Sequence, residues 1–503
     1  MSRAELRLDE LLRAAGMTAL GGRAGAATVR RVEYDSRRCG PGSLFVAIPG
    51  EHTDGHGHVA DALHRGAVAA VVQDAEAVPS GIPRLVVADT RAAVAALAAV
   101  VSGRPSAAMV VAGVTGTDGK TTTTTMLHAA WRGAGLRAGS LTTVDFRVDD
   151  RIEPNTTRQT TLEAVDLQDR LAAMLTEGVD RVALETSSHA LALHRVDGVD
   201  FDAAVYTRIT SEHLEFHGSR AEYLRTKAML LDRLGSGGVG VIDADDAFAA
   251  PVLTAIPVAR RLLYSAAGTP TADLFATGTA HGDAGVHFVA HTPWGSTEVR
   301  MRVAGSFNVA NALAALAAAC ATGAPFEEAV AGLEALARVG GRMERVDLGQ
   351  PFAVVIDYAH TAEALATVLR ELREVTPGRL WVVFGSAGER DREKRPAMGA
   401  VGAELADHLV LTDEDPRGED RTVILEEIAA GARAAGVSGD RLVLIPDRAA
   451  AIAHAAANAQ PGDTVLLAGK GHESCIIVGR DPVPWDERAV AEEALRRRLK
   501  SAR

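Results

Sequence analysis

The sequence predicts an α/β fold of three domains, each built around a largely parallel sheet. Its 503 residues exceed what one hydrophobic core usually supports. Short apolar runs alternate with helix-like segments along the chain, which is typical of parallel sheets covered by helices on both faces. Two breaks interrupt this alternation, "SGRPSA" at 102–107 and "ARVGGRMERVD" at 337–347. We therefore expect domains at 1–105, 106–337 and 338–503.

The expected elements follow in order along the chain. The expected strands are short apolar runs, whereas the expected helices have an apolar and a polar face. The clearest helices exceed about ten residues. In the first domain we expect strands at 43–48, 67–72 and 84–88 and a helix at 58–66; in the second, strands at 108–114, 181–185 and 202–207 and helices from 120 and over 308–323; in the third, strands at 352–357, 379–385, 408–412, 441–445 and 464–468 and a helix at 362–375.

Composition and charge exclude several classes of protein. The formal net charge is -12, which argues against nucleic-acid binding, because that affinity depends on clustered Lys and Arg. The three cysteines, Cys39, Cys320 and Cys475, lie far apart and show no metal-ligand spacing. No apolar run is long enough to span a membrane, and the first residues lack the apolar core of a secretion signal. We expect a cytoplasmic protein with no membrane partner.

The stretch "GVTGTDGKTTTTTML", at 113–127, is a candidate phosphate loop. Gly116 and Gly119 let backbone N–H groups wrap a polyphosphate, Lys120 can reach its outer oxygens, and the Thr121 hydroxyl can bind Mg²⁺. Val114 occupies the position where the strict phosphate-loop pattern has glycine. The alternative is a Gly/Thr-rich turn that binds nothing.

Two further strands end in residues suited to a metal–nucleotide site. Glu185 finishes the run "RVALE", and His213 follows the run "DAAVYT". Ligands bind at the carboxyl ends of parallel strands, so Thr121, Glu185 and His213 are candidates for one Mg²⁺ site. His213 is the less expected ligand, because Mg²⁺ prefers oxygen. The alternative for either residue alone is an ordinary surface position.

These residues resemble the Mur ligases, ATP-dependent enzymes that form amide bonds in peptidoglycan precursors. The loop is similar to the family's G-T-N-G-K-T-T motif, with Asp118 in place of Asn. The C-terminal "EDPRGED" and "GKGHE" resemble the branch that adds a diamino acid to UDP-N-acetylmuramoyl-L-alanyl-D-glutamate. The resemblance implies an N-terminal uridine-diphosphate domain, a central P-loop ATPase-type sheet and a Rossmann-like C-terminal domain. It also implies the use of ATP and Mg²⁺ and an acyl-phosphate intermediate, and we expect a monomer.

The resemblance also implies roles for individual residues. The implied ATP contacts are Gly116, Thr117, Asp118, Gly119, Lys120, Thr121, Thr122, Asn308, Asn311, Arg342, Asp357 and His360. The implied contacts to the UDP-muramoyl dipeptide are Ser36, Thr160, Thr161, Ser187, Arg195 and Lys227, and those to the amino acid are Arg390, Asp415, Arg417, Gly469 and Glu473. Lys120, Lys227 and His213 are the implied catalytic residues, and Thr121, Glu185, His213 and Lys227 the implied metal site.

Lys227 lies where these enzymes carry a lysine carbamate. An ammonium group would repel Mg²⁺, whereas capture of CO₂ turns the same side chain into an anionic oxygen ligand. The alternative, judged without the family, is an exposed helical lysine. For Asn308 the corresponding alternative is helix capping.

The diamino acid is the least constrained part of this interpretation. Arg390 and Arg417 suit the distal carboxylate of meso-diaminopimelate, which lysine and ornithine lack. Asp415, where the family usually has Asn, adds an anion beside the arginine, which would suit a bare ammonium group and hence lysine or ornithine. We expect diaminopimelate, with lysine or ornithine as the alternative. More remote alternatives are a folylpolyglutamate synthase-like ligase and a P-loop nucleotide switch without ligase activity.

Overall fold

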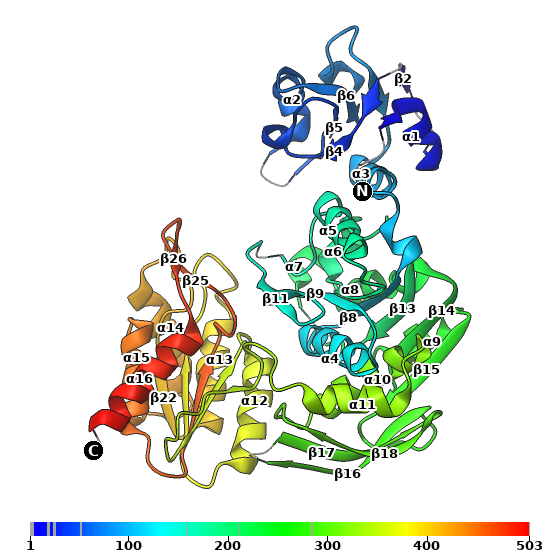
Figure 1. The fold of residues 1–503 in the computed structure, drawn as a ribbon. Helices are drawn as coiled ribbons and strands as arrows, with labels where there is room; N and C mark the ends of the chain where they lie inside the picture. The colour runs from blue at the N-terminus through cyan, green and yellow to red at the C-terminus, as the bar shows by residue number, and fades with distance from the viewer. Residues whose placement is uncertain are drawn as a thin grey trace. The chain divides into compact units, whose positions relative to one another are not determined.

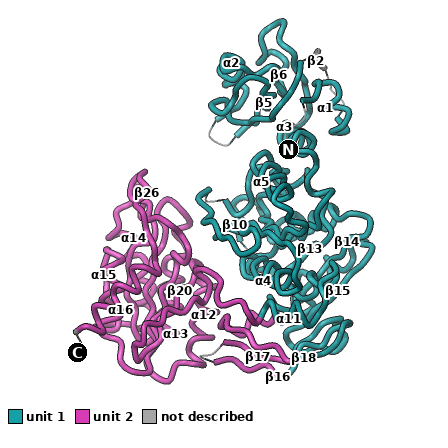
Figure 2. Tube along the Cα trace, in the orientation of Figure 1, with its two compact units in different colours: residues 1–277, 290–297, 310–333 teal, residues 278–289, 298–309, 334–503 magenta. Residues whose placement is uncertain are grey.

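The computed structural model describes residues 5–17, 21–23, 27–50, 53–157, 159–210, 212–282 and 285–501 (Figure 1). The chain divides into two compact units, 1–277 with 290–297 and 310–333, and 278–289 with 298–309 and 334–503 (Figure 2). Both units contain parallel strands and helices, so the predicted α/β class is confirmed. The bounds of the three predicted domains stay a prediction.

The first sheet belongs to the N-terminal part of the chain. Over the described residues its order is β2-β7-β6-β5-β4, with β4 to β7 parallel and β2 antiparallel at the edge. Asp89 begins the helix α3 (Thr90–Val101), because its Oδ1 accepts the N–H groups of Arg91 and Ala92. The other elements here are β1 (Leu6–Arg7), α1 (Leu8–Ala14), β2 (Gly21–Arg23), β3 (Thr28–Val29), β4 (Arg31–Glu33), η1 (Ser36–Arg38), β5 (Ser43–Val46), η2 (Gly55–His58), α2 (Val59–His64), β6 (Ala67–Val72), η3 (Ala75–Ala77), β7 (Arg84–Val86) and η4 (Pro105–Ala108).

The second sheet aligns the strands that carry the candidate phosphate loop and metal residues. Its order over the described residues is β11-β10-β9-β12-β8-β13-β14-β15-β16-β17-β18. The parallel strands β12 (Arg181–Glu185) and β13 (Phe201–Tyr206) flank β8 (Val110–Thr115), with Glu185 beside Val114 and Tyr206 beside Thr115. Their carboxyl ends therefore lie together at one edge, the usual place for a ligand in such sheets.

The remaining elements of this region complete the sheet and cover it. They are α4 (Lys120–Gly133), β9 (Ala138–Leu141), β10 (Asp145–Val148), β11 (Arg151–Pro154), α5 (Ala164–Thr176), α6 (Ser188–Ala192), α7 (Leu214–His217), α8 (Arg220–Ala228), η5 (Leu231–Arg233), β14 (Leu234–Asp243), α9 (Ala250–Ala255), β15 (Arg260–Ser265), β16 (Leu274–Gly282), β17 (Gly285–Thr292), β18 (Gly295–Met301), α10 (Asn308–Ala321) and α11 (Phe326–Ala335).

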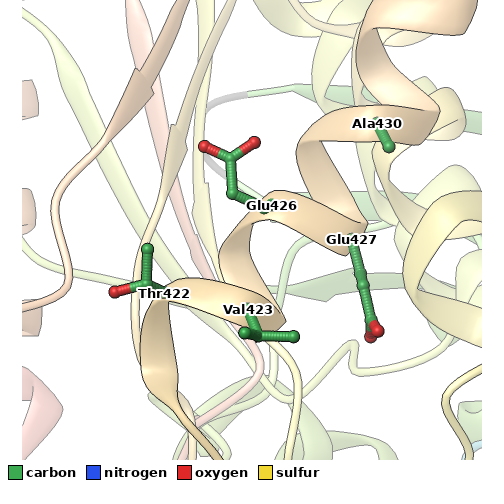
Figure 3. A pocket seen from close by; sticks show the side chains of 5 residues that line it. All are labelled: Thr422, Val423, Glu426, Glu427 and Ala430. Carbon is green, nitrogen blue, oxygen red and sulfur yellow. The ribbon is translucent and has the colours of Figure 1, made fainter.

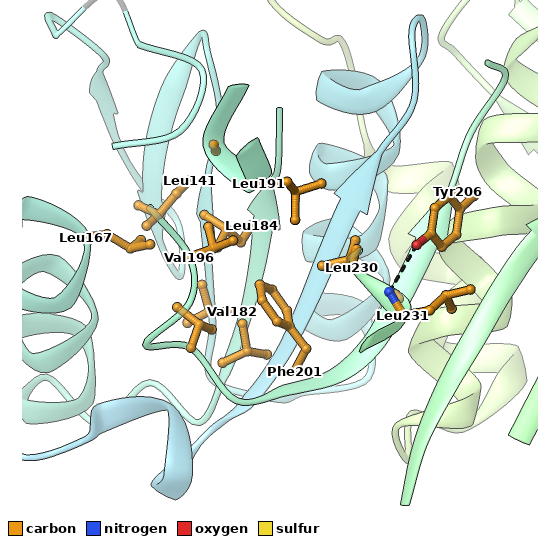
Figure 4. Close-up of a cluster of buried hydrophobic side chains, with 14 of the residues drawn as sticks. Leu141, Leu167, Val182, Leu184, Leu191, Val196, Phe201, Tyr206, Leu230 and Leu231 are labelled. Atoms are coloured by element: carbon orange, nitrogen blue, oxygen red, sulfur yellow. Dashed lines mark hydrogen bonds between the residues drawn. The ribbon is translucent and has the colours of Figure 1, made fainter. Parts of the chain in front are cut away.

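A hydrophobic cluster that includes side chains of β12 and β13 holds the segment after α8 in place (Figure 4). Leu184 and Phe201 of the sheet are buried in it. The Tyr206 hydroxyl accepts the N–H of Leu231 at 3.1 Å and donates to the carbonyl of Lys227 at 3.0 Å. The core therefore holds the backbone of Lys227 in place.

The third sheet lies in the C-terminal part of the chain, with the order β19-β20-β24-β21-β22-β23 over the described residues. It is parallel except at β19. Val382 packs with the cluster that includes α12, α13 and α14, and its neighbour Val383 packs with the cluster that includes α15 and α16. Helices therefore cover both faces, as predicted.

The elements of this region are β19 (Glu344–Arg345), β20 (Ala353–Asp357), α12 (Ala362–Val375), β21 (Leu380–Phe384), α13 (Lys394–Leu405), β22 (His408–Leu411), α14 (Arg421–Ala434), η6 (Gly439–Arg441), β23 (Leu442–Leu444), α15 (Arg448–Asn458), β24 (Thr464–Ala468), β25 (Cys475–Val478), β26 (Asp481–Pro484) and α16 (Glu487–Ser501). In the described parts of the whole chain, we find no helix with the length and apolar character to cross a membrane.

Candidate active site

The phosphate loop connects β8 to the N-terminus of α4. Gly116 and Gly119 have φ angles of 157° and 83°, in the region that favours glycine. A Cβ atom at Gly116 would lie 1.8 Å from Thr207 Oγ1, and one at Gly119 would lie 2.4 Å from Asn311 Oδ1. Both positions therefore require glycine for conformation and for space. The N-terminus of α4 adds a partial positive charge suited to phosphate.

Lys120, in the first turn of α4, contacts the backbone of the phosphate loop. Lys120 Nζ donates to the carbonyl oxygens of Gly116 at 3.1 Å and Thr117 at 2.7 Å. It is half-buried and lies over the loop, within reach of a phosphate held there. Asp118 is exposed and Thr122 is buried. A phosphate would thus meet a cationic side chain and a helix N-terminus together.

Glu185 lies at the end of β12 with its carboxylate directed to the first turn of α4. It accepts hydrogen bonds from Thr121 Oγ1 at 3.1 and 3.0 Å. The N–H and Oγ1 of Thr143 also donate to it, at 2.9 and 3.1 Å. The two predicted ligands Thr121 and Glu185 are therefore in contact and buried. They supply oxygen donors of the kind that Mg²⁺ prefers.

Lys227 is buried beside the loop, contrary to the alternative of an exposed helical lysine. Its side chain is 1% exposed, and Nζ donates to the Gly116 carbonyl at 2.7 Å. Nζ also lies 4.5 Å from the centre of the Tyr223 ring. Burial, followed by the nearby charge of Lys120, lowers the pKa of Lys227 well below its usual value. A neutral amine is the form that attacks CO₂, so this environment suits carbamate formation.

His213 occupies a different environment from Thr121 and Glu185. Its side chain is 41% exposed, and its ring nitrogens lie 3.6 Å from carboxylate oxygens of Glu212 and Glu215. Its ring centre lies 4.7 Å from that of His189. Its role as a metal ligand stays a prediction.

The loop predicted to bind the peptide joins the end of β12 directly. Thr161 Oγ1 donates to the Glu185 carbonyl at 2.8 Å and accepts the N–H of Ser187 at 3.0 Å. Arg195 donates to the Thr161 carbonyl at 3.2 Å and pairs with Glu163 at 2.7 Å. Thr161, Ser187 and Arg195 therefore gather around the same strand end as Glu185. Thr160 is half-buried beside them in sequence, and Ser36 is buried at the start of η1.

The two asparagines of α10 have different partners. Asn311 Oδ1 accepts the Thr123 hydroxyl at 3.2 Å, which places it against α4 and Gly119. Asn308 Nδ2 donates to the carbonyl of Ala304 at 2.6 Å, and its side chain is buried. Asn311 is therefore placed close to the phosphate loop.

In the second unit, three predicted nucleotide contacts lie around the end of β20. The Asp357 carboxylate accepts the N–H groups of Met343 and Ala359, each at 2.8 Å. The Arg342 guanidinium lies 4.7 Å from the centre of the Tyr358 ring, and His360 packs 4.7 Å from the same ring. Tyr358 therefore contacts both Arg342 and His360.

The predicted amino-acid residues lie on loops after β21, β22 and β24. Lys470 Nζ donates to Asp415 at 2.8 Å and to Glu473 at 2.5 Å. Arg417 has a φ angle of 52°, and its Nε is buried with no hydrogen-bond partner in the described residues. Gly469 donates its N–H to the Asp357 carbonyl at 3.1 Å, whereas Arg390 is exposed. All except Arg390 therefore lie on elements fixed by hydrogen bonds.

Sequence reasoning missed several residues that shape these sites. They are Thr143, Tyr223, Glu163 and Lys470, whose partners lie far away in sequence. Only the "GKGHE" similarity pointed to the neighbourhood of Lys470.

None of the predicted site residues lines the surface depression on α14 that Figure 3 shows. Its lining is Thr422, Val423, Glu426, Glu427 and Ala430, from one helix. Glu427 is paired with Arg395 at 2.6 Å. The depression offers no convergent polar groups, so we assign no ligand to it.

Comparisons with known proteins agree with this geometry. Three family models match: "Mur ligase family, catalytic domain" over residues 28–103, "Mur ligase middle domain" over 114–319 and "Mur ligase, glutamate ligase domain" over 341–471. A UDP-N-acetylmuramyl-tripeptide synthetase of Roseiflexus sp. is 47% identical over 92% of this chain and 94% of its own. A UDP-N-acetylmuramoyl-L-alanyl-D-glutamate–2,6-diaminopimelate ligase of Streptomyces avermitilis is 42% identical over 95% of both chains.

A solved structure is similar over the whole length. It is named as a UDP-N-acetylmuramoyl-L-alanyl-D-glutamate–2,6-diaminopimelate ligase and matches with a TM-score of 0.69 and 30% identity, over 99% of this chain and 100% of its own. Near-complete coverage and high identity establish the relationship independently of any single motif. The chain belongs to the Mur ligase family.

Proposed function

We propose that this protein is the ATP-dependent ligase that joins meso-2,6-diaminopimelate to UDP-N-acetylmuramoyl-L-alanyl-D-glutamate. One observation carries the proposal most strongly. At the end of β12, the Glu185 carboxylate binds Thr121 of the phosphate loop, while the Glu185 carbonyl binds Thr161 of the peptide loop. A single residue thus connects a triphosphate site to a peptide site, as transfer of a phosphoryl group to a peptide carboxylate requires.

The reaction proceeds in two steps. The γ-carboxylate of the D-glutamyl residue attacks the γ-phosphorus of ATP, the bond to the β-phosphate breaks, and ADP leaves. The amine of the diamino acid then attacks the acyl carbon, phosphate leaves, and the amine loses a proton. Phosphorylation is needed because a free carboxylate has no competent leaving group.

The chain's own residues position and stabilise these groups. Lys120 turns from the loop carbonyls to the transferring phosphoryl group and offsets its charge. Thr121 and Glu185 would hold Mg²⁺, with a carbamate at Lys227 as a further oxygen ligand. When bound, the ion neutralises phosphate charge. Thr161, Ser187 and Arg195 orient the peptide.

The C-terminal contacts favour a diamino acid with a distal carboxylate. Arg417 Nε is buried and lacks a hydrogen-bond partner in the described residues, so a carboxylate would satisfy it. The Asp415 charge, which favoured lysine or ornithine, already has a partner in Lys470. Several relatives named as diaminopimelate ligases support the same choice. Lysine or ornithine remains the second candidate.

A direct experiment offers diaminopimelate, lysine and ornithine separately, with ATP, Mg²⁺ and the UDP-muramoyl dipeptide, and identifies the product by mass. We expect the diaminopimelate product to form at the highest kcat/KM. A faster lysine or ornithine product would change the assigned amino acid. Phosphate release that does not depend on the dipeptide would instead indicate a nucleotide switch. A cytoplasmic location and a monomeric state belong to the same proposal.

A further inference from the structure

Lys470 is a buried cation between two carboxylates of the predicted amino-acid site. Its side chain is fully buried, and Nζ binds Asp415 Oδ1 at 2.8 Å and Glu473 Oε2 at 2.5 Å. Burial lowers its pKa, but the charges of Glu473 and Asp415 outweigh that effect, and the net shift is upward. Lys470 therefore stays protonated and neutralises acidic charge within the site.

Asp415 is also tied to the segment that holds Arg417. The same Oδ1 atom accepts the N–H of Ile477 at 3.0 Å. The N–H of Arg417 donates to the Ile477 carbonyl at 2.9 Å, and Gly479 donates back to the Arg417 carbonyl at 2.8 Å. Both polar groups of the Ile477 backbone are thus bound by the loop at 415–417. The charge at Asp415 consequently lies close to the arginine expected to bind a carboxylate.

A third acidic residue, Glu414, interacts electrostatically with both Lys470 and Asp415. Glu414 is buried, and its Oε2 has no hydrogen-bond partner in the described residues. Burial raises its pKa, the cations Lys394 and Lys470 oppose that effect, and the charge of Asp415 adds to it. With Lys470 removed, Asp415 and Glu473 would lose their shared cation, and the site would repel a substrate carboxylate.

We infer that Lys470 determines the choice of diamino acid: by occupying Asp415 and Glu473 it prevents them from attracting the distal ammonium group of lysine or ornithine, which no carboxylate accompanies. It also leaves Arg417 free to bind the distal carboxylate of diaminopimelate. This inference rests on the proposed ligase function and assigns a specificity role to a residue outside the predicted contacts. Lys470 acts through its neighbours, so it is a positioning residue. Its effect should appear in the ratio of kcat/KM for diaminopimelate to that for lysine.

The test compares four proteins by this ratio. In Lys470→Met we expect the ratio to fall about tenfold or more, because one uncompensated charge near a substrate carboxylate has an effect of that order. In Lys470→Met with Asp415→Asn we expect at least half of the loss, on a logarithmic scale, to be recovered. Lys500→Met, which removes an exposed lysine near the end of α16, should leave the wild-type ratio unchanged.

The outcomes separate the inference from the proposed function. An unchanged ratio in Lys470→Met, or no recovery in the double variant, would overturn the role of Lys470. If Lys470→Met does not fold, the double variant is compared with Asp415→Asn alone. A ratio at least threefold lower in the double variant than in Asp415→Asn then supports the inference, because Glu473 is the carboxylate that loses its cation. Equal ratios in the two proteins overturn it. A wild-type protein that makes no tripeptide would refute the proposed function instead.

Discussion

Replacement of Gly119 by alanine tests whether the phosphate loop binds nucleotide in the conformation described. Gly119 has a φ angle of 83°, and an added Cβ would lie 2.4 Å from Asn311 Oδ1. Asn311 would have to move, which breaks its 3.2 Å hydrogen bond with the Thr123 hydroxyl. The substitution therefore combines backbone strain with a lost contact between α4 and α10.

The size of the effect follows from these two contributions. A left-handed backbone costs a residue with a Cβ about 1–2 kcal/mol. A typical hydrogen bond contributes about 0.5–1.5 kcal/mol. The free protein can relieve this cost by moving the loop, but phosphate binding requires the loop in place. A sum of about 2–3 kcal/mol would weaken nucleotide binding by about 30- to 150-fold.

The assay is calorimetric titration of ADP and Mg²⁺ into wild type, Gly119→Ala and a matched control. Gly135→Ala is that control, because Gly135 has a φ angle of 73° but an added Cβ meets nothing within 4 Å. It carries similar backbone strain outside the loop, so ADP affinity should equal that of wild type. Folded Gly119→Ala protein that binds ADP within threefold of wild type would refute the reasoning.

Three further changes test other parts of the account. Lys227→Ala should nearly abolish amide formation while circular dichroism shows an intact fold; full activity would contradict the carbamate. Arg417→Ala should raise KM for diaminopimelate far more than KM for ATP in steady-state kinetics; equal increases would remove its assignment to the carboxylate. Arg448→Met should destabilise the protein by about 3–5 kcal/mol in denaturant unfolding, because it leaves buried Glu487 without the cation that now binds it at 2.9 Å. Adding Glu487→Leu should recover most of that loss, and no recovery would contradict the buried-pair explanation.

Local sequence signals predicted most of the fold. Buried strands such as β8 and β21 are continuous apolar runs, and the glycine-rich loop marks where β8 gives way to α4. Ligands bind at the carboxyl ends of parallel strands, and this rule predicted that Thr121 lies near Glu185. The two side chains are in contact. These features depend on neighbouring residues or on a general property of parallel sheets.

Pairings between distant residues could not be predicted in this way. From the sequence we expected Asp415 to be an uncompensated anion. No local pattern shows that Lys470, which lies 55 residues away, binds its carboxylate. The burial of Lys227 likewise depends on the phosphate loop, because its Nζ binds the carbonyl of Gly116, which lies 111 residues away. His213 also follows a strand, but the contacts of its ring are with Glu212 and Glu215, and its role as a metal ligand stays a prediction.

The most direct test of the account follows the oxygen atoms of the D-glutamyl γ-carboxylate. The UDP-muramoyl dipeptide is labelled there with ¹⁸O and allowed to react with ATP, Mg²⁺ and diaminopimelate, and the inorganic phosphate is analysed by mass spectrometry. Activation by phosphorylation predicts that one ¹⁸O atom enters phosphate for each amide bond formed. Amide formation with unlabelled phosphate would contradict the proposed reaction.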